Sequence, residues 1–193
     1  MDSDEASLIA ELTTDLERSF EKLMTMYWHQ LYAFVLRRTA NSQDAEDILS
    51  EAFVRSYIAL KGYPIERLRV LKLRSWLYKI TYHEYCRYIG RSASPLAPVA
   101  YLEEEVGFEK EDDENKQPEM LLQDAELRQE LESLVTKLPD RYREPVSLYY
   151  FEGFSYQEIA DVLNQPIGTI KSSVHRGIRL LRKVVSTQSN EVY

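Results

Sequence analysis

Apolar side chains recur every three or four residues through most of the first half of the chain, a spacing typical of amphipathic helices. The pattern predicts three helices, from about Leu16 to Arg38, from about Asp44 to Leu60 and from about Leu71 to Ile89. Asn41 or Ser42 should cap the second of them. No stretch alternates apolar and polar residues as a half-buried strand would, and the chain has only 6 glycines. We therefore predict an all-α fold.

A capping box marks the start of another helix in the second half. Ser155 is followed three residues later by Glu158, and in such a pair each side chain satisfies an unpaired backbone donor of the first turn. The helix should begin at Tyr156 and end before Pro166, which cannot continue the hydrogen-bond ladder. A second helix should follow at once, with one buried stripe formed by Ile167, Ile170, Val174, Ile178, Leu181 and Val185. The two helices and the tight turn between them predict a helix-turn-helix.

The remaining surface of this second helix is polar and basic. Hydroxyl, imidazole and cationic groups of this kind pair with phosphate oxygens and base edges in DNA. They belong to Thr169, Lys171, Ser172, His175, Arg176 and Arg179. Basic amphipathic helices are also common on proteins that bind no DNA, so the helix pair predicts DNA binding only in combination with the rest of the chain.

The net charge of -8 is unusual for a DNA-binding protein, but it is unevenly distributed along the sequence. Residues 103–119 carry nine acidic side chains against two lysines. Residues 61–91 carry eight Lys or Arg against two Glu, and residues 164–193 carry five against one. Local fields rather than the net charge govern association with DNA, so both basic segments are candidate DNA-binding segments.

The acidic segment also divides the chain. Residues 92–119 contain three prolines and clustered acids with little apolar periodicity, which predicts a flexible linker. Helical spacing resumes at Leu127, Leu131, Leu134 and Leu138. Pro139 should open a further helix that extends through Tyr150. We predict a first domain from residue 1 to 91, an acidic linker from 92 to 119 and a second domain from 120 to 193.

Cysteine content and hydropathy indicate the compartment. The single cysteine, Cys86, excludes an internal disulfide and fits a reducing environment. The longest apolar run, Leu31 to Leu36, is far too short to span a bilayer, and the acidic start of the chain lacks the basic residues of a signal peptide. We expect a cytoplasmic protein without membrane insertion.

The sequence offers little support for catalysis. No glycine-rich phosphate loop, nucleophile elbow or pair of catalytic acids stands out. His83 and Cys86 have a spacing that could ligate a metal, but no second pair lies near, and His29 and His175 belong to other segments. We expect no enzyme activity, no metal and no cofactor; a helical metal-dependent enzyme is the alternative that a metal analysis would test.

Two blocks of sequence resemble bacterial RNA polymerase sigma factors of the extracytoplasmic function (ECF) type. The first block, LYAFVLRRTANSQDAEDILSEAFVRSY followed by LRSWLYKI, is similar to the family's second conserved region. The second block, LPDRYREPVSLYYFEGFSYQEIADVLNQPIGTIKSSVHRGIRLLRK, is similar to its fourth region. The resemblance implies a region 2 helical bundle and a region 4 helix-turn-helix domain. It also implies a protein that binds core RNA polymerase and directs transcription initiation at particular promoters.

The resemblance implies that the helix starting DAEDILSEAF docks on the clamp helices of the polymerase's largest subunits. The candidate docking residues are Asp44, Glu46, Asp47 and Glu51, with Arg37 and Arg38 extending the same surface. Acids in the first turn of a helix also complement its dipole, and the two roles are compatible. Ala45, Ile48 and Phe53 are expected in the core in either case.

The resemblance further implies that the basic stretch from Arg67 to Arg91 captures and melts the minus-10 promoter element. Unpaired bases are held by aromatic side chains beside cations, and this stretch interleaves both. The expected contacts are Arg74, Lys79, Tyr82, His83, Arg87 and Arg91. Trp76 is expected to be a core residue. His83 and Arg87 replace an Asn and an Asp that are frequent in the family, which puts the usual minus-10 base preference in doubt.

The helix-turn-helix is implied to recognise the minus-35 element in duplex DNA through the six polar residues given above. Lys171 and Arg176 would bond phosphates or guanine edges, and Thr169 near the helix start would bind phosphate. Ser172 and His175 would contact bases or backbone. Family members are often held inactive by an anti-sigma factor, which is a further candidate partner.

The main alternative is a helix-turn-helix transcriptional regulator that acts without being a polymerase subunit. TIKSSVHRGI is also similar to the recognition helix of response-regulator effector domains. Such regulators usually carry a phosphoacceptor or ligand-sensing domain, and the helical first half of this chain suits neither. Stable, sequence-specific binding to duplex DNA without polymerase would favour this alternative.

Overall fold

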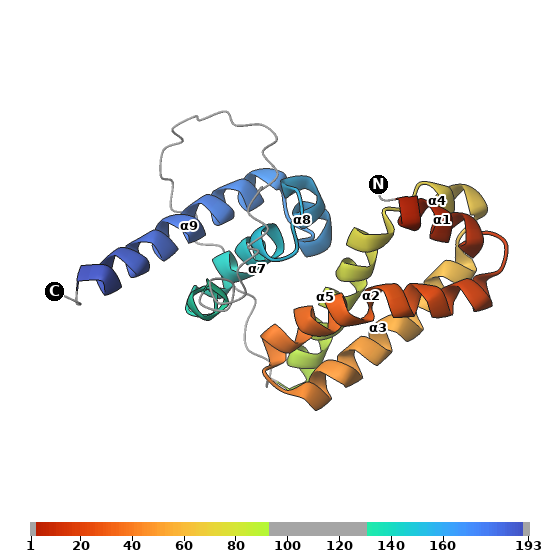
Figure 1. The fold of residues 1–193 in the computed structure, drawn as a ribbon, viewed down its shortest axis with the longest axis horizontal. Helices are drawn as coiled ribbons and strands as arrows, with labels where there is room; N and C mark the ends of the chain where they lie inside the picture. The colour runs from red at the N-terminus through yellow and green to blue at the C-terminus, as the bar shows by residue number, and fades with distance from the viewer. Residues whose placement is uncertain (1–2, 93–130, 191–193) are drawn as a thin grey trace. The chain divides into compact units, whose positions relative to one another are not determined.

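The computed structural model describes residues 3–92 and 131–190, and all regular secondary structure in these two segments is helical (Figure 1). The chain separates into two compact units, Met1–Leu102 and Glu103–Tyr193. The predicted all-α fold is confirmed. Leu127 and residues 93–119 of the predicted linker lie outside the described residues. The domain limits at 91 and 120 therefore stay predictions.

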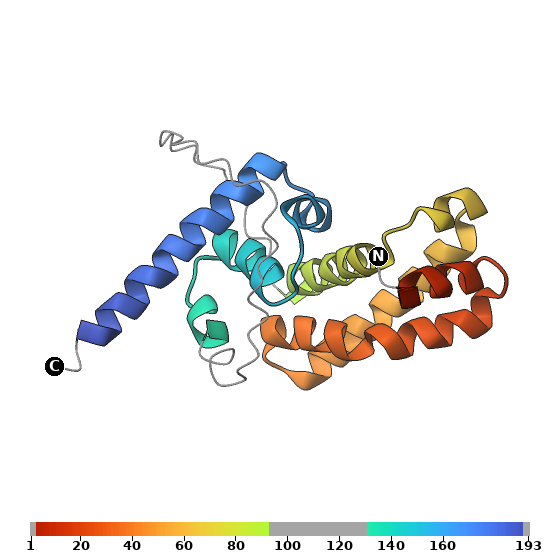
Figure 2. The same cartoon turned by 45° about the horizontal axis from the view of Figure 1, so that its top comes forward.

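Unit 1 is a helical bundle whose frame consists of α2, α3 and α5. Its helices are α1 (Ser3–Leu12), α2 (Leu16–Thr39), α3 (Ser42–Gly62), α4 (Ile65–Arg69) and α5 (Leu73–Ser92). α2 and α3 run side by side as a hairpin, and α5 packs against both (Figures 1 and 2). The largest fully buried side chains of the unit are Leu23, Leu31, Phe34, Leu49, Leu60, Leu73, Leu77 and Tyr78. Each such burial contributes about 1.5–3 kcal/mol, so this core fixes the three helices as a frame.

Side chains close the helix ends of the α2–α3 hairpin. The carboxylate of Asp15 accepts a hydrogen bond from the Arg18 backbone N–H at 3.1 Å. After α2, Ala40 adopts the left-handed conformation with φ 52°, which turns the chain toward α3. The Asn41 side chain then accepts from the backbone N–H groups of Gln43 and Asp44. Asn41 rather than Ser42 is thus the cap, as one of the two predicted options.

Two helices of unit 1 were not predicted. α1 packs on α2 and α4 and buries Leu8, Ile9 and Leu12. Its Glu5 carboxylate accepts hydrogen bonds from the backbone N–H groups of Leu73, at 2.9 Å, and Arg74, at 3.4 Å. The first turn of a helix leaves backbone donors without intrahelical partners. α1 therefore supplies the cap of α5 from a distant part of the sequence.

Unit 2 contains the predicted helix-turn-helix. A helical segment at residues 131–135 precedes α7 (Asp140–Tyr150), α8 (Tyr156–Leu163) and α9 (Ile167–Asn190). The capping box is confirmed: the Ser155 N–H donates to Glu158 Oε2 at 3.0 Å, and the Glu158 N–H donates to Ser155 Oγ at 3.3 Å. Asn164 follows the end of α8, and its left-handed backbone, with φ 53°, directs the chain into the turn.

α9 packs closely on α7. Ile170, Val174 and Leu181 of the predicted stripe are buried, and Ile178 is half-buried. The prediction is wrong for Ile167, which is 40% exposed. Ile167 is the first residue of α9, and α7 and α8 cover the helix only from the following turn. The Val185 side chain lies outside the described residues. At Gly177 an added Cβ would lie 2.5 Å from Val146 Cγ2, so only glycine permits this approach.

Candidate DNA and polymerase surfaces

The structure brings all six predicted minus-35 residues onto one side of α9. Lys171, His175 and Arg179 are exposed and spaced by four, so they form a row along the helix. Half-buried beside this row are Thr169, Ser172 and Arg176. At about 100° per residue the six side chains fall within roughly 160° of the helix circumference. The opposite side carries the residues that pack on α7 and α8, so the polar side faces solvent.

Aromatic contacts hold the helices that support α9. The rings of Tyr149 in α7 and Tyr156 in α8 are stacked, with centroids 4.9 Å apart and an interplanar angle of 5°. Tyr150 packs edge-on against Tyr149 at 5.2 Å. Burial, followed by hydrogen bonding to Tyr149, raises the pKa of Tyr156, and burial also raises that of Tyr150. These phenols stay neutral, so α7 and α8 are joined by uncharged, packed rings.

The predicted minus-10 residues are only partly brought together on α5. Lys79, His83 and Arg87 are spaced by four and form one row, beside which Tyr82 lies. Arg74 precedes His83 by nine residues, or two and a half turns, so it points to the opposite side. Its guanidinium carbon lies 5.5 Å from the ring centroid of the buried Tyr78.

Arg91, the last predicted minus-10 residue, belongs to α5, but its side chain lies outside the described residues.

His83 is held in a neutral form in this row. Burial lowers its pKa below the usual value of 6.5, and the nearby Lys79 lowers it further, while Glu84 acts in the opposite direction. A neutral imidazole can donate one hydrogen bond and accept another. Near pH 7, His83 can therefore hydrogen-bond to a base, whereas Lys79 and Arg87 contribute positive charge.

Trp76 lies at the edge of the core rather than in it, contrary to expectation. The buried stripe of α5 follows Leu73, Leu77, Thr81 and Glu84, which leaves Trp76 half-buried beside it. The Trp76 indole N–H donates to Tyr63 Oη at 3.3 Å, and the guanidinium carbon of Arg67 lies 3.8 Å from the Tyr63 ring centroid. Two aromatic rings and a cation thus meet, with Tyr63 at the end of α3, Arg67 in α4 and Trp76 in α5, a combination that suits an unpaired base.

The predicted polymerase-binding acids occupy two sides of α3. Asp47 and Glu51 are exposed and Asp44 is half-buried, and at about 100° per residue the three share one side. Glu46 is exposed on a different side, toward α2. Ala45, Ile48 and Phe53 are buried, which confirms their expected place in the core. The acids therefore flank the exposed surface of α3 rather than forming a single row.

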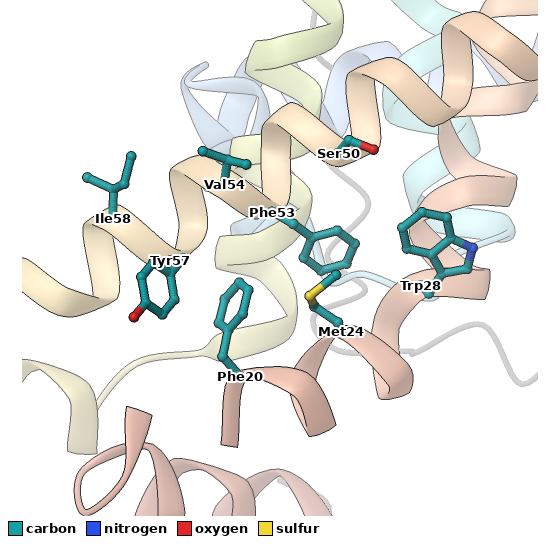
Figure 3. A pocket seen from close by; sticks show the side chains of 8 residues that line it. All are labelled: Phe20, Met24, Trp28, Ser50, Phe53, Val54, Tyr57 and Ile58. Carbon is teal, nitrogen blue, oxygen red and sulfur yellow. The ribbon is translucent and has the colours of Figure 1, made fainter. Parts of the chain in front are cut away.

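An apolar groove lies between α2 and α3, and sequence reasoning did not identify it. Its volume is about 380 Å³, and its walls consist of Phe20, Met24, Trp28, Ser50, Phe53, Val54, Tyr57 and Ile58 (Figure 3). Val54 and Ile58 are 54% and 64% exposed, although they are large apolar side chains. Their spacing of four, out of phase with the buried stripe of α3, was the available signal. Ser50 and Tyr57 of the groove lie on the side of α3 that carries Glu46, whereas Val54 and Ile58 continue the row of Asp47 and Glu51.

Arg37 and Arg38 are less available than the α3 acids. Both are half-buried at the end of α2. Arg38 Nη1 donates to the Phe34 carbonyl at 2.6 Å, and its guanidinium carbon lies 3.5 Å from the Phe34 ring centroid. Arg38 is thus folded back on its own helix, where a cation complements the C-terminal dipole. A role for the two arginines in docking stays a prediction.

Two further observations concern chemistry and membranes. Among the described side chains, no three His, Cys, Asp or Glu residues converge as metal ligands would. None of the helices in residues 3–92 and 131–190 combines the length and the apolar content that crossing a bilayer requires.

Comparison with known proteins assigns both units. The sigma-70 region 2 family matches residues 23–94, and the family of sigma-70, region 4, matches residues 128–181. The ECF RNA polymerase sigma factor SigW of Bacillus subtilis (strain 168) is 31% identical over 172 residues, which cover 86% of this chain and 88% of SigW. The ECF RNA polymerase sigma-E factor of Escherichia coli (strain K12) is 31% identical over 165 residues, 83% of each chain.

A solved structure shares the fold. The sigma factor RpoE from Bartonella quintana, in a co-crystal with the anti-sigma factor NepR, superposes with a TM-score of 0.58 at 21% identity and covers 88% of this chain and 98% of that one. The helical units, the capped helix-turn-helix and the two sequence relationships agree with one another. The chain belongs to the ECF family of RNA polymerase sigma factors.

Proposed function

We propose that this sigma factor binds core RNA polymerase through unit 1 and directs initiation at a promoter class that both units recognise. α3 and its groove dock on the polymerase, α5 captures and melts the minus-10 element, and α9 recognises the minus-35 element. The observation that carries the proposal is the gathering of six polar and basic side chains on the exposed side of a capped helix-turn-helix. Recognition divided over two modules of one chain makes the second contact effectively intramolecular once the first is made.

The minus-10 surface consists of Lys79, Tyr82, His83 and Arg87, with Trp76 and Tyr63 as added candidates for stacking. Melting without an energy source depends on binding energy for unpaired bases, which rings and cations supply. The neutral state of His83 favours base contacts by hydrogen bonding, as the Asn that is frequent at this position would make. The imidazole of His83 presents its donor and acceptor in a different geometry from an Asn amide. We therefore expect a base preference at the minus-10 element that differs from the usual one.

Three consequences follow for the role of the protein. It acts where polymerase and chromosomal DNA are, so we place it in the cytoplasm. It contributes binding energy and no chemistry of its own, so we expect no catalytic activity. Since the related RpoE structure contains an anti-sigma factor, a protein of that kind is a candidate partner here.

Reconstitution with core polymerase tests the proposal. The purified protein alone should bind promoter duplex weakly, whereas the holoenzyme should start transcripts from one promoter class. Sequencing the transcript starts would identify both elements. Failure to co-purify with core polymerase or to support transcription would contradict the proposal. Tight, sequence-specific binding to duplex DNA without polymerase would favour the regulator alternative instead.

A further inference from the structure

A buried carboxylate lies on α5 beneath the minus-10 surface. Glu84 is one of two buried carboxylates among the described residues, and its side chain is 7% exposed. Such a group is stable only when cations or donors replace its lost hydration. Arg87 Nη1 donates to Glu84 Oε1 at 3.1 Å and lies 3.5 Å from Oε2. From α3, Arg55 Nε lies 2.7 Å from the same Oε1.

Arg55 extends this pairing to the exposed surface of α3. Its Nη2 lies 2.9 Å from Oε1 of Glu51, one helical turn earlier in α3. Four side chains thus form one ion-pair chain, in the order Glu51, Arg55, Glu84 and Arg87. Glu51 belongs to the acids assigned to polymerase docking, and Arg87 belongs to the cations assigned to minus-10 DNA. The ion-pair chain therefore joins the two functional surfaces of unit 1.

The position of Arg55 is a compromise between two carboxylates. Although its Nε lies close to Glu84, this buried N–H makes no aligned hydrogen bond. A guanidinium is a rigid planar fork, and its strongest pairing with a carboxylate uses two parallel N–H groups. In the observed orientation the fork is divided between the two carboxylates, with Nε 2.7 Å from Glu84 and Nη2 2.9 Å from Glu51. If Glu51 were engaged elsewhere, the fork could turn and align with Glu84.

We propose that Arg55 is a positioning residue that couples polymerase docking at Glu51 to DNA capture at Arg87. When a polymerase cation binds Glu51, Arg55 aligns with Glu84 and compensates its charge, and Arg87 is released to bind a DNA phosphate. The docked protein then holds the minus-10 strand more tightly than the free protein does. By thermodynamic linkage, the DNA strand raises the affinity for core polymerase by the same factor. This inference rests on the proposed function of the two surfaces.

Measuring that factor tests the proposal. The affinity of core polymerase for the full chain is determined with and without a saturating single-stranded oligonucleotide that carries the non-template minus-10 sequence mapped with the holoenzyme. Arg55→Gln should lower the factor about three- to tenfold, while core binding without DNA is retained. A merely structural role would change the unfolding temperature or core binding itself, but not the ratio of the two affinities.

A matched control lies in the same unit. Lys22 Nζ and Glu11 Oε2 form an exposed ion pair at 2.6 Å, outside both functional surfaces. Lys22→Gln should leave the factor at the wild-type value. An unchanged factor in folded Arg55→Gln protein would overturn the proposal. Absence of core binding by the wild-type chain would instead contradict the proposed function, so the two failures are distinguishable.

A second variant keeps the test valid if Arg55→Gln does not fold. Arg55→Lys retains the positive charge next to Glu84 but lacks the planar fork that serves two carboxylates. It should lower the factor by at least about twofold. A wild-type factor in folded Arg55→Lys protein would overturn the proposal in the same way.

Discussion

α5 and α9, the two helices proposed to bind DNA, differ in whether their cations are already paired with acidic side chains. On α9, Lys171, Arg176 and Arg179 have no acidic partner among the described side chains, whereas on α5 Arg87 is bound to the buried Glu84. A cation without a partner can bind a phosphate directly, while a paired one must first exchange its carboxylate. Under the proposed function, the cations of α9 are available to duplex DNA at once. Arg87 of α5 becomes available only after its pairing with Glu84 is exchanged.

Charge reversal on α9 should produce the largest effect, and it would test whether the unpaired cations of this helix bind duplex DNA. Each phosphate or guanine contact of such a helix contributes about 1–3 kcal/mol, so Lys171→Glu with Arg176→Glu should weaken minus-35-dependent promoter binding more than about a hundredfold. The measurement compares holoenzyme binding to promoters with and without the minus-35 element. Core binding should be unchanged, and Lys137→Glu, outside α9, is the control. Equal loss of core binding would contradict the division between the units.

The readiness of α9 also depends on its close packing on α7. Gly177→Ala would place a Cβ 2.5 Å from Val146 Cγ2 and 3.3 Å from Tyr142 Cβ, both of them buried residues. We expect a loss of about 1–3 kcal/mol in the free energy of unfolding of unit 2, measured by urea denaturation of the full chain. Gly168→Ala, in the same helix with nothing within 4 Å, should be neutral or stabilising. If the two variants were equally stable, α9 would approach α7 less closely than the distances at Gly177 indicate.

On the α5 side, the cap that α1 provides can be removed. Glu5→Ala deletes the acceptor of the Leu73 and Arg74 backbone donors, and loss of a helix cap costs about 0.5–2 kcal/mol. Thermal unfolding of unit 1 should therefore occur at a lower temperature. Glu21→Ala, at an exposed position of α2 beyond its first turn, serves as the control. Wild-type stability of Glu5→Ala would indicate that α5 does not depend on α1 for its start.

The smallest expected effect concerns the proton of His83. Folding lowers its pKa below 6.5, so the neutral side chain stabilises unit 1 fully above pH 6.5, and this contribution declines as the pH falls below that value. In the same range a protonated His83 adds a cation beside Lys79. Holoenzyme binding to minus-10 single strands should strengthen about twofold between about pH 7.5 and 5.5.

His83→Gln should abolish this pH response, and His29→Gln, exposed on α2, should retain it. A proton NMR titration of His83 would sharpen the comparison further. Glu84 raises the pKa of His83, so Glu84→Gln should lower that pKa below the wild-type value. An unchanged titration would show that the Glu84 carboxylate does not reach the minus-10 surface.

Local signals predicted the elements of this protein well. The starts of α8, α7 and α3 could be placed from the sequence, because each depends on residues within a few positions of the helix start. These are Ser155 with Glu158 for α8, Pro139 for α7 and Asn41 for α3. α9 was equally clear, because its polar and apolar residues separate by helical spacing alone.

Features that depend on distant residues were not predictable. In the sequence Glu84 is an acid within a basic stretch, and no nearby residue indicates that it is buried. Its charge is compensated in the core by Arg55, which comes from another helix. Trp76 shared the spacing of the buried leucines, but no helix covers it completely. α1 carried acids in its first turn and apolar residues at Leu8, Ile9 and Leu12, a signal too short to stand out from the sequence alone.

The contact between Glu5 and the start of α5 has a consequence for how the protein is made. Residues 5 and 73 are 68 positions apart, so α1 leaves the ribosome long before its partner exists. The α2–α3 hairpin, whose contacts are local in sequence, can form during this interval. We expect α1 to dock only after the beginning of α5 has been synthesised. Although α1 is made before α2, α3 and α5, it would then be among the last of these helices to reach its place.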